Sequence, residues 1–580
     1  MLHTNDPVLL ALIQKQLDHI SAQMGRVMSR TARSPIFSDS HDFSCFIADA
    51  EGQLVSVADG IPIHTGGGGF AIRAVLDDFG TSIAPDDLFI LSDPYEAGGN
   101  HLPDWTLVRP VFDGGVLIAF TCNRAHQSDI GGGAAGTYNS EATEIYHEGI
   151  RLPVVKLADK GAIRTDLWKL LLINSRCPDL LDGDLRAMIG STKVGHDRVL
   201  AIADEHGTEK TLGCFRGIID HAHKRMRGAL SRIPDGEYFG EDATDTDCFD
   251  AVNVTVRARL KVEGDQLLVD FTGTDPQIKG FKNSSIANTY SAVYMGLLSF
   301  LDTTIPRNEG AFKPITIVAP EGTIVNAKPP APMTMNTVNP ATEIVYAIWK
   351  ALGQALPDEA CAGWGKITNC ISSGRLSSDE DNFVMYHWHA FPAGGAVKGR
   401  DGFGTIGNLV TLGGMHLPNV ESYEQKYPIT IHQQEYRCDA AGAGQYRGGA
   451  GIRYSADVHV EAEYSFRGEG GRTPSGYGVN GGLTGSRGVM RLQFSGQPEE
   501  IEAPQYGVRR LKPLKVLIDS PGGGGWGNPF DRRPDLVLAD VLDGLVSVQA
   551  ASDLYGVHID TERMEVDAEQ TASLRNEATD

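Results

Sequence analysis

The sequence predicts an α+β fold with several domains, and three observations lead to this prediction. The chain has 580 residues, well beyond the roughly 100–200 residues of one domain. Its hydrophobic periodicity changes from strand-like to helical and back along the chain. Of its many glycines, 68 in all, a large share lies among short strands after residue 365. We therefore expect an N-terminal sheet region over 1–165, a helical segment over 166–235, a mixed α/β region over 236–360, and a glycine-rich β region with a terminal cap over 361–580.

The composition is that of a folded, acidic protein. Hydrophobic residues make up 41% and charged residues 22%, which is ordinary for globular proteins. The 51 basic and 74 acidic residues give a net charge of −23, so nucleic acid and anionic membrane surfaces are poor partners. No apolar run approaches the ~18 residues of a membrane span, and Gln14, Lys15 and Gln16 interrupt any signal-like stretch. The eight cysteines form no CxxC pair, which predicts buried thiols and a cytoplasmic location.

The N-terminal region begins with an amphipathic helix. Asp6 is suited to cap it, Pro7 fits its first position, and apolar residues then recur at three- and four-residue spacing to about Arg30. A hairpin over 45–57 and a helix over 70–79 follow. Branched and aromatic residues then predict three strands of one sheet: LFILSD at 88–93, WTLVRPVF at 105–112 and GVLIAF at 115–120.

The later regions alternate between helical and strand-like patterns. The segment 167–233 has few glycines or prolines and predicts helices. A second hairpin is expected from the alternating runs at 252–260 and 267–271. Further helices are predicted at 284–301 and 337–355, with a Pro-rich loop at 326–332 between them.

Histidines and acids gather between the predicted N-terminal strands. His101 and Asp104 lie between the first and second strands, and His126 ends the third. If these strands are neighbours, the side chains meet at one sheet edge. Asp42, just before the first hairpin, offers a further carboxylate. Two imidazoles with carboxylates are a common site for a catalytic divalent metal, which can lower the pKa of bound water to about 7.

Other interpretations of these residues remain open. A histidine at a strand end is more often a surface or hydrogen-bonded residue. The pattern also permits a non-haem iron oxygenase, although that site usually has a tighter HxD pair. His64, before the glycines 66–69, could line the same pocket, but a plain turn is favoured.

Three further features are weaker candidates. Glu144, His147 and Glu148 could act as acid or base, although helical charges usually face solvent. Cys45 is better explained as a buried strand residue than as a nucleophile. The PGGGGWG stretch at 521–527 could form an anion-binding nest, but the chain has no GxxxxGK[ST] phosphate loop.

Several stretches together match one known family: DFSC at 42–45, IPIH at 61–64, DPY at 93–95, GGNHLPD at 98–104, RAH at 124–126, DIGG at 129–132, EIYHEG at 144–149, PGGGGWGNP at 521–529 and the segment 540–556. The chain resembles the hydantoinase B/oxoprolinase family from about residue 6 to about residue 558. This family includes subunits of ATP-dependent hydantoinases, 5-oxoprolinases and caprolactamase, and is related to a subunit of acetone and acetophenone carboxylases.

The resemblance implies a metal site and a partner. In relatives the HLPD and RAH motifs bind a divalent metal, here mapping to His101, Asp104 and His126, with Asp42 as a further ligand. The ion would be Zn, Mn or Fe. ATP would bind an A-type partner subunit, and we expect a heterotetramer. Asn100 and Gln127 depart from the family, which often has Thr and His there, so we expect some substrate contacts to differ.

The implied reaction is hydrolysis of a cyclic amide that the partner has activated by phosphorylation. Hydroxide generated at the metal would attack the carbonyl, and Asp129 or another carboxylate would accept the proton of the water. Two alternatives stay open: a subunit of an ATP-dependent ketone carboxylase, and a non-catalytic scaffold for the partner.

Overall fold

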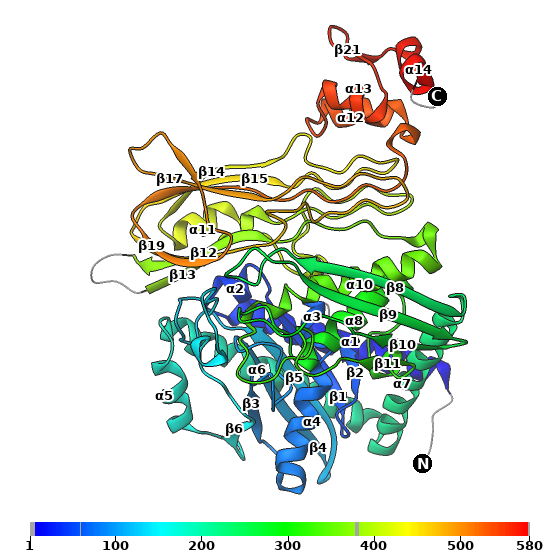
Figure 1. The fold of residues 1–580 in the computed structure, drawn as a ribbon. Helices are drawn as coiled ribbons and strands as arrows, with labels where there is room; N and C mark the ends of the chain where they lie inside the picture. Colours follow the sequence, from blue (N-terminus) through cyan, green and yellow to red (C-terminus); the bar gives the residue numbers. More distant parts are fainter. Residues whose placement is uncertain (1–5, 58–59, 377–381, 578–580) are drawn as a thin grey trace. The chain divides into compact units, whose positions relative to one another are not determined.

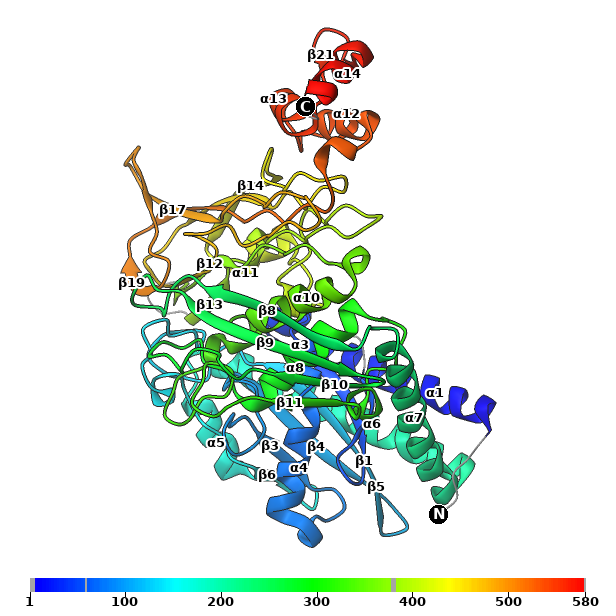
Figure 2. The same ribbon diagram turned by 45° about the vertical axis from the view of Figure 1, so that its right-hand side comes forward.

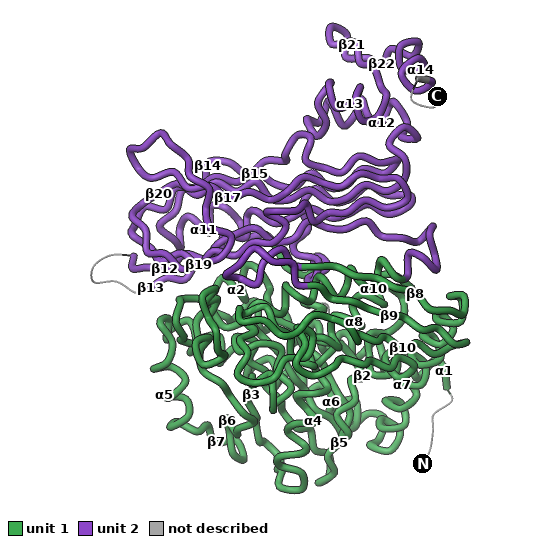
Figure 3. Tube along the Cα trace, in the orientation of Figure 1, with its two compact units in different colours: residues 1–243, 255–351, 414–416 green, residues 244–254, 352–413, 417–580 purple. Residues whose placement is uncertain are grey.

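The computed structural model describes residues 6–57, 60–376 and 382–577. They form two compact units (Figure 3). Unit 1 comprises residues 1–243, 255–351 and 414–416, and unit 2 comprises the segments between and after them. The predicted boundaries at 165 and 235 both fall inside unit 1. Several sheets with many helices between them confirm the predicted α+β class (Figure 1).

Unit 1 is built on a seven-stranded antiparallel sheet of order β2-β1-β5-β4-β3-β6-β7. The predicted first hairpin is β1 and β2, and the three predicted strands are β3, β4 and β5. β4 and β5 pair along almost their whole length. The strands span Phe43–Asp49 (β1), Leu54–Val57 (β2), Leu88–Leu91 (β3), Asp104–Asp113 (β4), Val116–His126 (β5), Val155–Asp159 (β6) and Ala162–Ile163 (β7).

Helices cover both faces of this sheet. On one face, Phe46 and Val108 join a core cluster with Ile72 and Val75 of α4 (Gly68–Phe79). On the other face, the neighbouring positions meet α6 (Pro178–His206): Thr121 donates to the Thr192 carbonyl. Because successive side chains point to opposite faces, every residue of β1 is buried.

Three long helices, α1 (Pro7–Thr31), α6 and α7 (Thr208–Leu230), pack against one another (Figure 2). The predicted cap is confirmed, since the Asp6 carboxylate accepts hydrogen bonds from the amides of Val8 and Leu9. The predicted helical segment corresponds to α5 (Thr165–Ile173), α6 and α7. Among the residues that the structure describes, no helix is long and apolar enough to span a bilayer.

The remainder of unit 1 is a second sheet with helices. Its strands have the order β11-β10-β9-β8, and β9 and β10 form the second predicted hairpin. The helices expected at 284–301 and 337–355 are α8 and α10. The bounds are Gly236–Thr244 (β8), Val254–Glu263 (β9), Gln266–Asp270 (β10), Ile315–Val318 (β11), Pro35–Ser38 (α2), Pro62–Thr65 (α3), Ile286–Phe300 (α8), Glu309–Phe312 (α9) and Ala341–Ala355 (α10).

Unit 2 contains two further sheets, of orders β13-β12-β16-β19 and β14-β15-β20-β17-β18. Their inner faces share one core that includes Cys370, Tyr454 and Phe466. The bounds are Thr368–Arg375 (β12), Asn382–Tyr386 (β13), Val420–Lys426 (α11), Ile429–Tyr436 (β14), Ile452–Val458 (β15), Ala462–Gly468 (β16), Val489–Phe494 (β17), Glu500–Glu502 (β18), Gly507–Leu511 (β19) and Leu514–Asp519 (β20).

Beside these sheets, extended glycine-rich segments of unit 2 pack directly against one another. A Cβ atom added at Gly523 would lie 2.0 Å from the Gly394 carbonyl oxygen, and one at Gly524 would lie 1.9 Å from that of Tyr477. Only glycine allows so close an approach of backbones. The amides of the run donate to carbonyls of neighbouring segments, Gly523 to Gly449 and Gly524 to Gly363. The suggested anion nest at 521–527 is therefore wrong, because its N–H groups are already occupied.

A small cap ends unit 2. It has its own core around Val537, Ala551 and Tyr555, and its buried Arg532 forms ion pairs with Asp401 and Asp540. Such a bidentate, buried arrangement holds the cap to the glycine-rich segments. The bounds are Pro534–Leu542 (α12), Val548–Tyr555 (α13), Ile559–Asp560 (β21), Glu565–Val566 (β22) and Ala568–Glu577 (α14).

Candidate metal centre

The strand ends bring the predicted ligands together. β4 begins at Asp104, β5 ends at His126, and these two residues are direct partners in the ladder. His101 lies in the turn just before β4. One ligand atom from each of the three residues lies within 4.8 Å of the others, and all three residues are buried. The expectation that neighbouring strands carry these side chains to one sheet edge is met.

Both oxygens of Asp104 face imidazole nitrogens. Oδ1 lies 2.9 Å from Nε2 of His101 and 3.2 Å from Nδ1 of His126. Oδ2 lies 3.3 Å from Nε2 of His64. Yet Nε2 of His101 and Oδ2 of Asp104 are buried with no hydrogen-bond partner. Two unsatisfied atoms of ligand type at one point fit a cation held there, because buried polar groups are otherwise almost always hydrogen-bonded.

Asp42 and His64 extend the cluster. Asp42 directly precedes β1, and its carbonyl accepts the N–H of His126. Its carboxylate lies 3.6 Å from Nε2 of His64, which lies on α3. The sequence favoured a plain turn for His64, whereas the structure places it against both carboxylates. The glycines after His64 indicated that the chain is closely packed at this point. A Cβ atom at Gly66 would lie only 2.6 Å from Cα of Ser291 on α8.

The electrostatics of the cluster follow from burial and charge. Burial raises the pKa of Asp104, but the adjacent imidazoles of His101 and His64 outweigh it and hold the pKa well below its ordinary value. Burial lowers the pKa of His101, and the negative charge of Asp104 reverses this so that the net shift is upward. For His64 burial dominates and lowers the pKa to about 4. The His64 imidazole is therefore neutral at pH 7.

Arg124 of the RAH motif supports the two segments that carry His64 and His101. Its fully buried guanidinium donates to the carbonyls of His64 and Gly98 and to Oδ1 of Asn100. Asn100, one of the departures from the family pattern, also donates to the Ile63 carbonyl. Burial lowers the pKa of Arg124 to about 10, against the attraction of Asp104. The Arg124 guanidinium thus joins α3, which carries His64, to the loop that carries His101.

Gln127, the other residue that departs from the family pattern, is also buried and packed. The Gln127 amide donates to the Ala125 carbonyl and to Sδ of Met188 on α6.

Tyr138, which sequence reasoning missed, stacks on His126 with ring centroids 5.7 Å apart. It is an aromatic wall beside the imidazole.

Asp129 has contacts of a different kind. Its buried carboxylate accepts hydrogen bonds from the amides of Gly131, Gly136 and Arg176 and from the Arg176 guanidinium. These four donors make it an anchor for the surrounding loop, and the prediction that it accepts a proton gains no support from its contacts.

The structure distinguishes the weaker candidate residues by their burial. Glu144 and His147 are exposed, as expected, whereas Glu148 is fully buried. Burial raises the pKa of the Cys45 thiol to about 12, which fits a strand residue and not a nucleophile. None of the eight cysteines is joined in a disulfide, but Cys438 is exposed and Cys361 half-buried, contrary to the expectation of burial.

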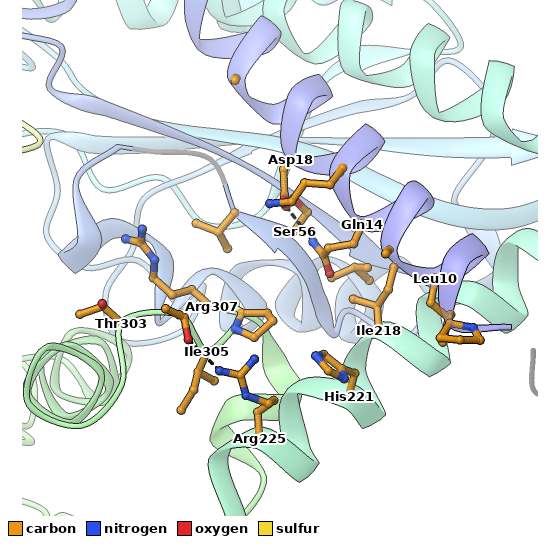
Figure 4. A pocket seen from close by; sticks show the side chains of 18 residues that line it. Leu10, Gln14, Asp18, Ser56, Ile218, His221, Arg225, Thr303, Ile305 and Arg307 are labelled. Atoms are coloured by element: carbon orange, nitrogen blue, oxygen red, sulfur yellow. Dashed lines mark hydrogen bonds and ion pairs between the residues drawn. The ribbon is translucent and has the colours of Figure 1, made fainter. Parts of the chain in front are cut away.

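Unit 1 also contains a cavity of about 580 Å³ away from these residues (Figure 4). Its walls come from α1, β2, α7 and the loop 303–307. Asp18 in its wall accepts hydrogen bonds from Gln14 and Ser56. None of the acids and histidines described above lines it, so it is separate from the candidate metal centre.

Comparison with known proteins decides the family. The family model described as hydantoinase B/oxoprolinase matches residues 6–529. The chain belongs to the hydantoinase B/oxoprolinase family. The resemblance recognised in the sequence is thereby confirmed.

Individual family members align over nearly their whole length. The chain is 32% identical to the beta subunit of the caprolactamase of Pseudomonas jessenii, over 96% of this chain and 97% of that one. It is 30% identical to a B-type subunit of a D-/L-hydantoinase from a Pseudomonas species, over 98% of both.

Two solved structures share the fold. The crystal structure of the ATP-dependent caprolactamase of Pseudomonas jessenii matches with a TM-score of 0.91 at 32% identity, covering 99% of this chain and 100% of that one. The nucleotide-free structure of an acetone carboxylase also gives 0.91, at 18% identity, covering 99% and 83%. The second likeness shows a common fold.

Proposed function

We propose that this chain is the metal-containing subunit of an ATP-dependent cyclic amide hydrolase. The observation that carries the proposal is the buried cluster of His101, Asp104 and His126, with its two unsatisfied ligand-type atoms. Relatives named as subunits of a caprolactamase and of a hydantoinase support the reaction class.

Four residues would hold the ion: Asp42, His101, Asp104 and His126. Their mixed nitrogen and oxygen donors suit Zn, Mn or Fe. A divalent ion bound there would supply Lewis acidity towards an amide carbonyl and acidify a water molecule. The donor chemistry fits the group that the family implies.

The chain's own residues would position these donors. Arg124 holds the loops of His64 and His101 in place. His64, uncharged at neutral pH, lies against Asp42 and Asp104, a neighbour that leaves the negative charge of both carboxylates in place. Tyr138 stacks on His126 and restricts the rotation of that ring.

The partner would perform the other half of the reaction. Resonance stabilises an amide, so opening an unstrained ring needs activation, and this chain has no phosphate loop. We therefore assign ATP binding and phosphorylation of the substrate to an A-type subunit, in a heterotetramer. The names of the caprolactamase and hydantoinase relatives, each given as one subunit of a larger enzyme, support such a partner. The free cysteines are in keeping with a cytoplasmic location.

The test is co-purification with the A-type partner, followed by elemental analysis and an ATP-dependent assay on hydantoin, 5-oxoproline and plain lactams. We expect a bound divalent metal and a ring-opened product, both lost in His101→Ala and retained in His147→Ala, which changes an exposed histidine. Incorporation of labelled bicarbonate into a ketone, without ring opening, would identify a carboxylase instead. Full turnover by a complex that contains His101→Ala would indicate that this chain is a non-catalytic scaffold.

A further inference from the structure

Glu148 is a buried acid outside the cluster. It follows a short 3₁₀ turn and has no solvent exposure. Its two oxygens accept the backbone N–H groups of two consecutive residues, Met333 at 2.8 Å and Thr334 at 2.7 Å. The contact joins residues 185 and 186 positions apart in the sequence.

The carbonyl of Thr334 in turn accepts a hydrogen bond from Nδ1 of His101. A carbonyl can only accept, so the proton of this bond must belong to Nδ1. The other nitrogen, Nε2, is then the one directed at Asp104, 2.9 Å away. Glu148 therefore binds the N–H of the same residue whose carbonyl, in the next peptide unit, orients the His101 ring.

The use of an acid here is costly. A carboxylate buried without a cation pays a desolvation penalty, and burial raises the pKa of Glu148 to about 7 in spite of its two amide donors. A carboxylate is nevertheless the side chain that offers two acceptor oxygens and no donor, which two adjacent amides require. Packing alone would be served by an apolar residue.

Other contacts hold the same segment but do not replace this one. The Tyr95 hydroxyl donates to the Ala331 carbonyl, and the Asn336 amide donates to the Asn100 carbonyl. These bonds flank Thr334 on both sides. Glu148 binds the amide of Thr334 and so fixes the backbone on the N-terminal side of the residue whose carbonyl His101 contacts.

We propose that Glu148 is a positioning residue of the metal centre, which acts through the backbone of Thr334 to hold His101 with its proton on Nδ1 and with Nε2 directed at the ion. The inference rests on the metal site of the proposed function. Partners that bind the far nitrogen of a ligand histidine fix its tautomer, and their loss typically weakens metal affinity by about 10- to 100-fold.

The test compares Glu148→Gln with Glu144→Gln, an exposed acid of the same EIYHEG stretch. In Glu148→Gln an amide N–H₂ replaces one acceptor and faces a backbone N–H. Zn²⁺ affinity is measured by competition with a chelator, after circular dichroism has shown that each variant is folded. We expect about 10- to 100-fold weaker binding in Glu148→Gln and wild-type binding in Glu144→Gln. If Glu148→Gln does not fold, Glu148→Asp, which keeps the charge but shortens the reach, takes its place.

A second measurement separates positioning from general support. In the metal-free, ¹⁵N-histidine-labelled protein, the Nδ1 proton of His101 is assigned by its disappearance in His101→Gln. We expect this proton to exchange slowly with solvent in wild type and faster in Glu148→Gln. A merely structural role would leave its exchange unchanged, and that result would overturn the inference.

A double-mutant cycle completes the test. If Glu148 acts through His101, Glu148→Gln should cost no further affinity in the His101→Gln background. Equal losses in both backgrounds would overturn the inference. A wild-type protein that binds no divalent metal would instead refute the metal site itself, so the two failures are distinguishable.

Discussion

Nε2 of His64 lies 3.3 Å from Oδ2 of Asp104, the carboxylate whose other oxygen faces His101 and His126. One aspartate thus lies between three imidazoles. His64 is the member that the sequence pattern did not favour as a site residue, and its place beside Asp42 and Asp104 makes it the first residue to test.

His64→Ala should weaken metal binding without removing a predicted ligand. The carboxylates of Asp42 and Asp104 lose the imidazole that orients them, and loss of such a contact typically costs about 10- to 100-fold in affinity. Chelator competition with Zn²⁺ measures the effect. His147→Ala is the matched control, because that histidine is exposed. Unchanged affinity in His64→Ala would show that the two carboxylates are held without it.

Metal should raise the thermal stability of the protein through Asp104. A ligand that binds only the folded state stabilises it by about 2.7 kcal/mol at a hundred times its dissociation constant. We expect Tm to fall on chelation and to recover on adding Zn²⁺ or Mn²⁺. Asp104→Asn should abolish this response, while Asp86→Asn, at an exposed turn position, should retain it. An equal response in both variants would contradict the assignment.

Asp184 should make stability depend on pH. Its buried carboxylate accepts the amides of Arg33 and Ser34, and burial raises its pKa to about 6. The unfolded value is about 3.9, so the folded chain keeps this proton to higher pH. The wild-type protein therefore loses stability as pH rises from about 4 to about 6, by up to about 3 kcal/mol.

Asp184→Asn removes that slope. Its stability relative to wild type should increase across the same pH window and stay level above it, as measured by thermal unfolding of metal-free protein at pH 4.5 and 7. Asp204→Asn, on the exposed side of the same helix, controls for the loss of one negative charge. A constant difference between Asp184→Asn and wild type at both pH values would speak against the raised pKa.

Gly523→Ala should destabilise unit 2. The added Cβ would lie 2.0 Å from the Gly394 carbonyl oxygen, and overpacking of this kind costs roughly 1–3 kcal/mol or more. Gly471→Ala is the control, since its nearest atoms would be 3.9 Å away. Urea unfolding of the two variants should separate them clearly; similar midpoints would mean that the glycine segments can move apart.

The sequence predicted much of unit 1 and the heart of its site. The cap at Asp6 and the hairpin at β1 and β2 have strong local signals, and the partnership of Asp104 with His126 follows from two adjacent strands. The family motifs pointed to the same residues. These features could be predicted because local sequence patterns and the pairing of neighbouring strands are enough to determine them.

The rest depended on contacts that leave no local pattern. Thr334 contributes a backbone carbonyl from 233 residues away, and any residue type could supply it. The sequence favours a solvent-facing position for Glu148 over a role as acid or base, but the stretch forms a 3₁₀ turn that buries it. The packing of the glycines in unit 2 likewise needs partner segments that are distant in sequence, so their spacing alone suggested an anion nest.

The contact between His101 and Thr334 has a consequence for biosynthesis. When His101 leaves the ribosome, the peptide that orients its ring lies 233 residues further along the chain and has yet to be made. While the chain is still shorter than that, Nδ1 of His101 lacks the carbonyl that it contacts in the folded protein. The orientation that the His101 ring has in the folded protein is thus reached only after synthesis has passed Thr334.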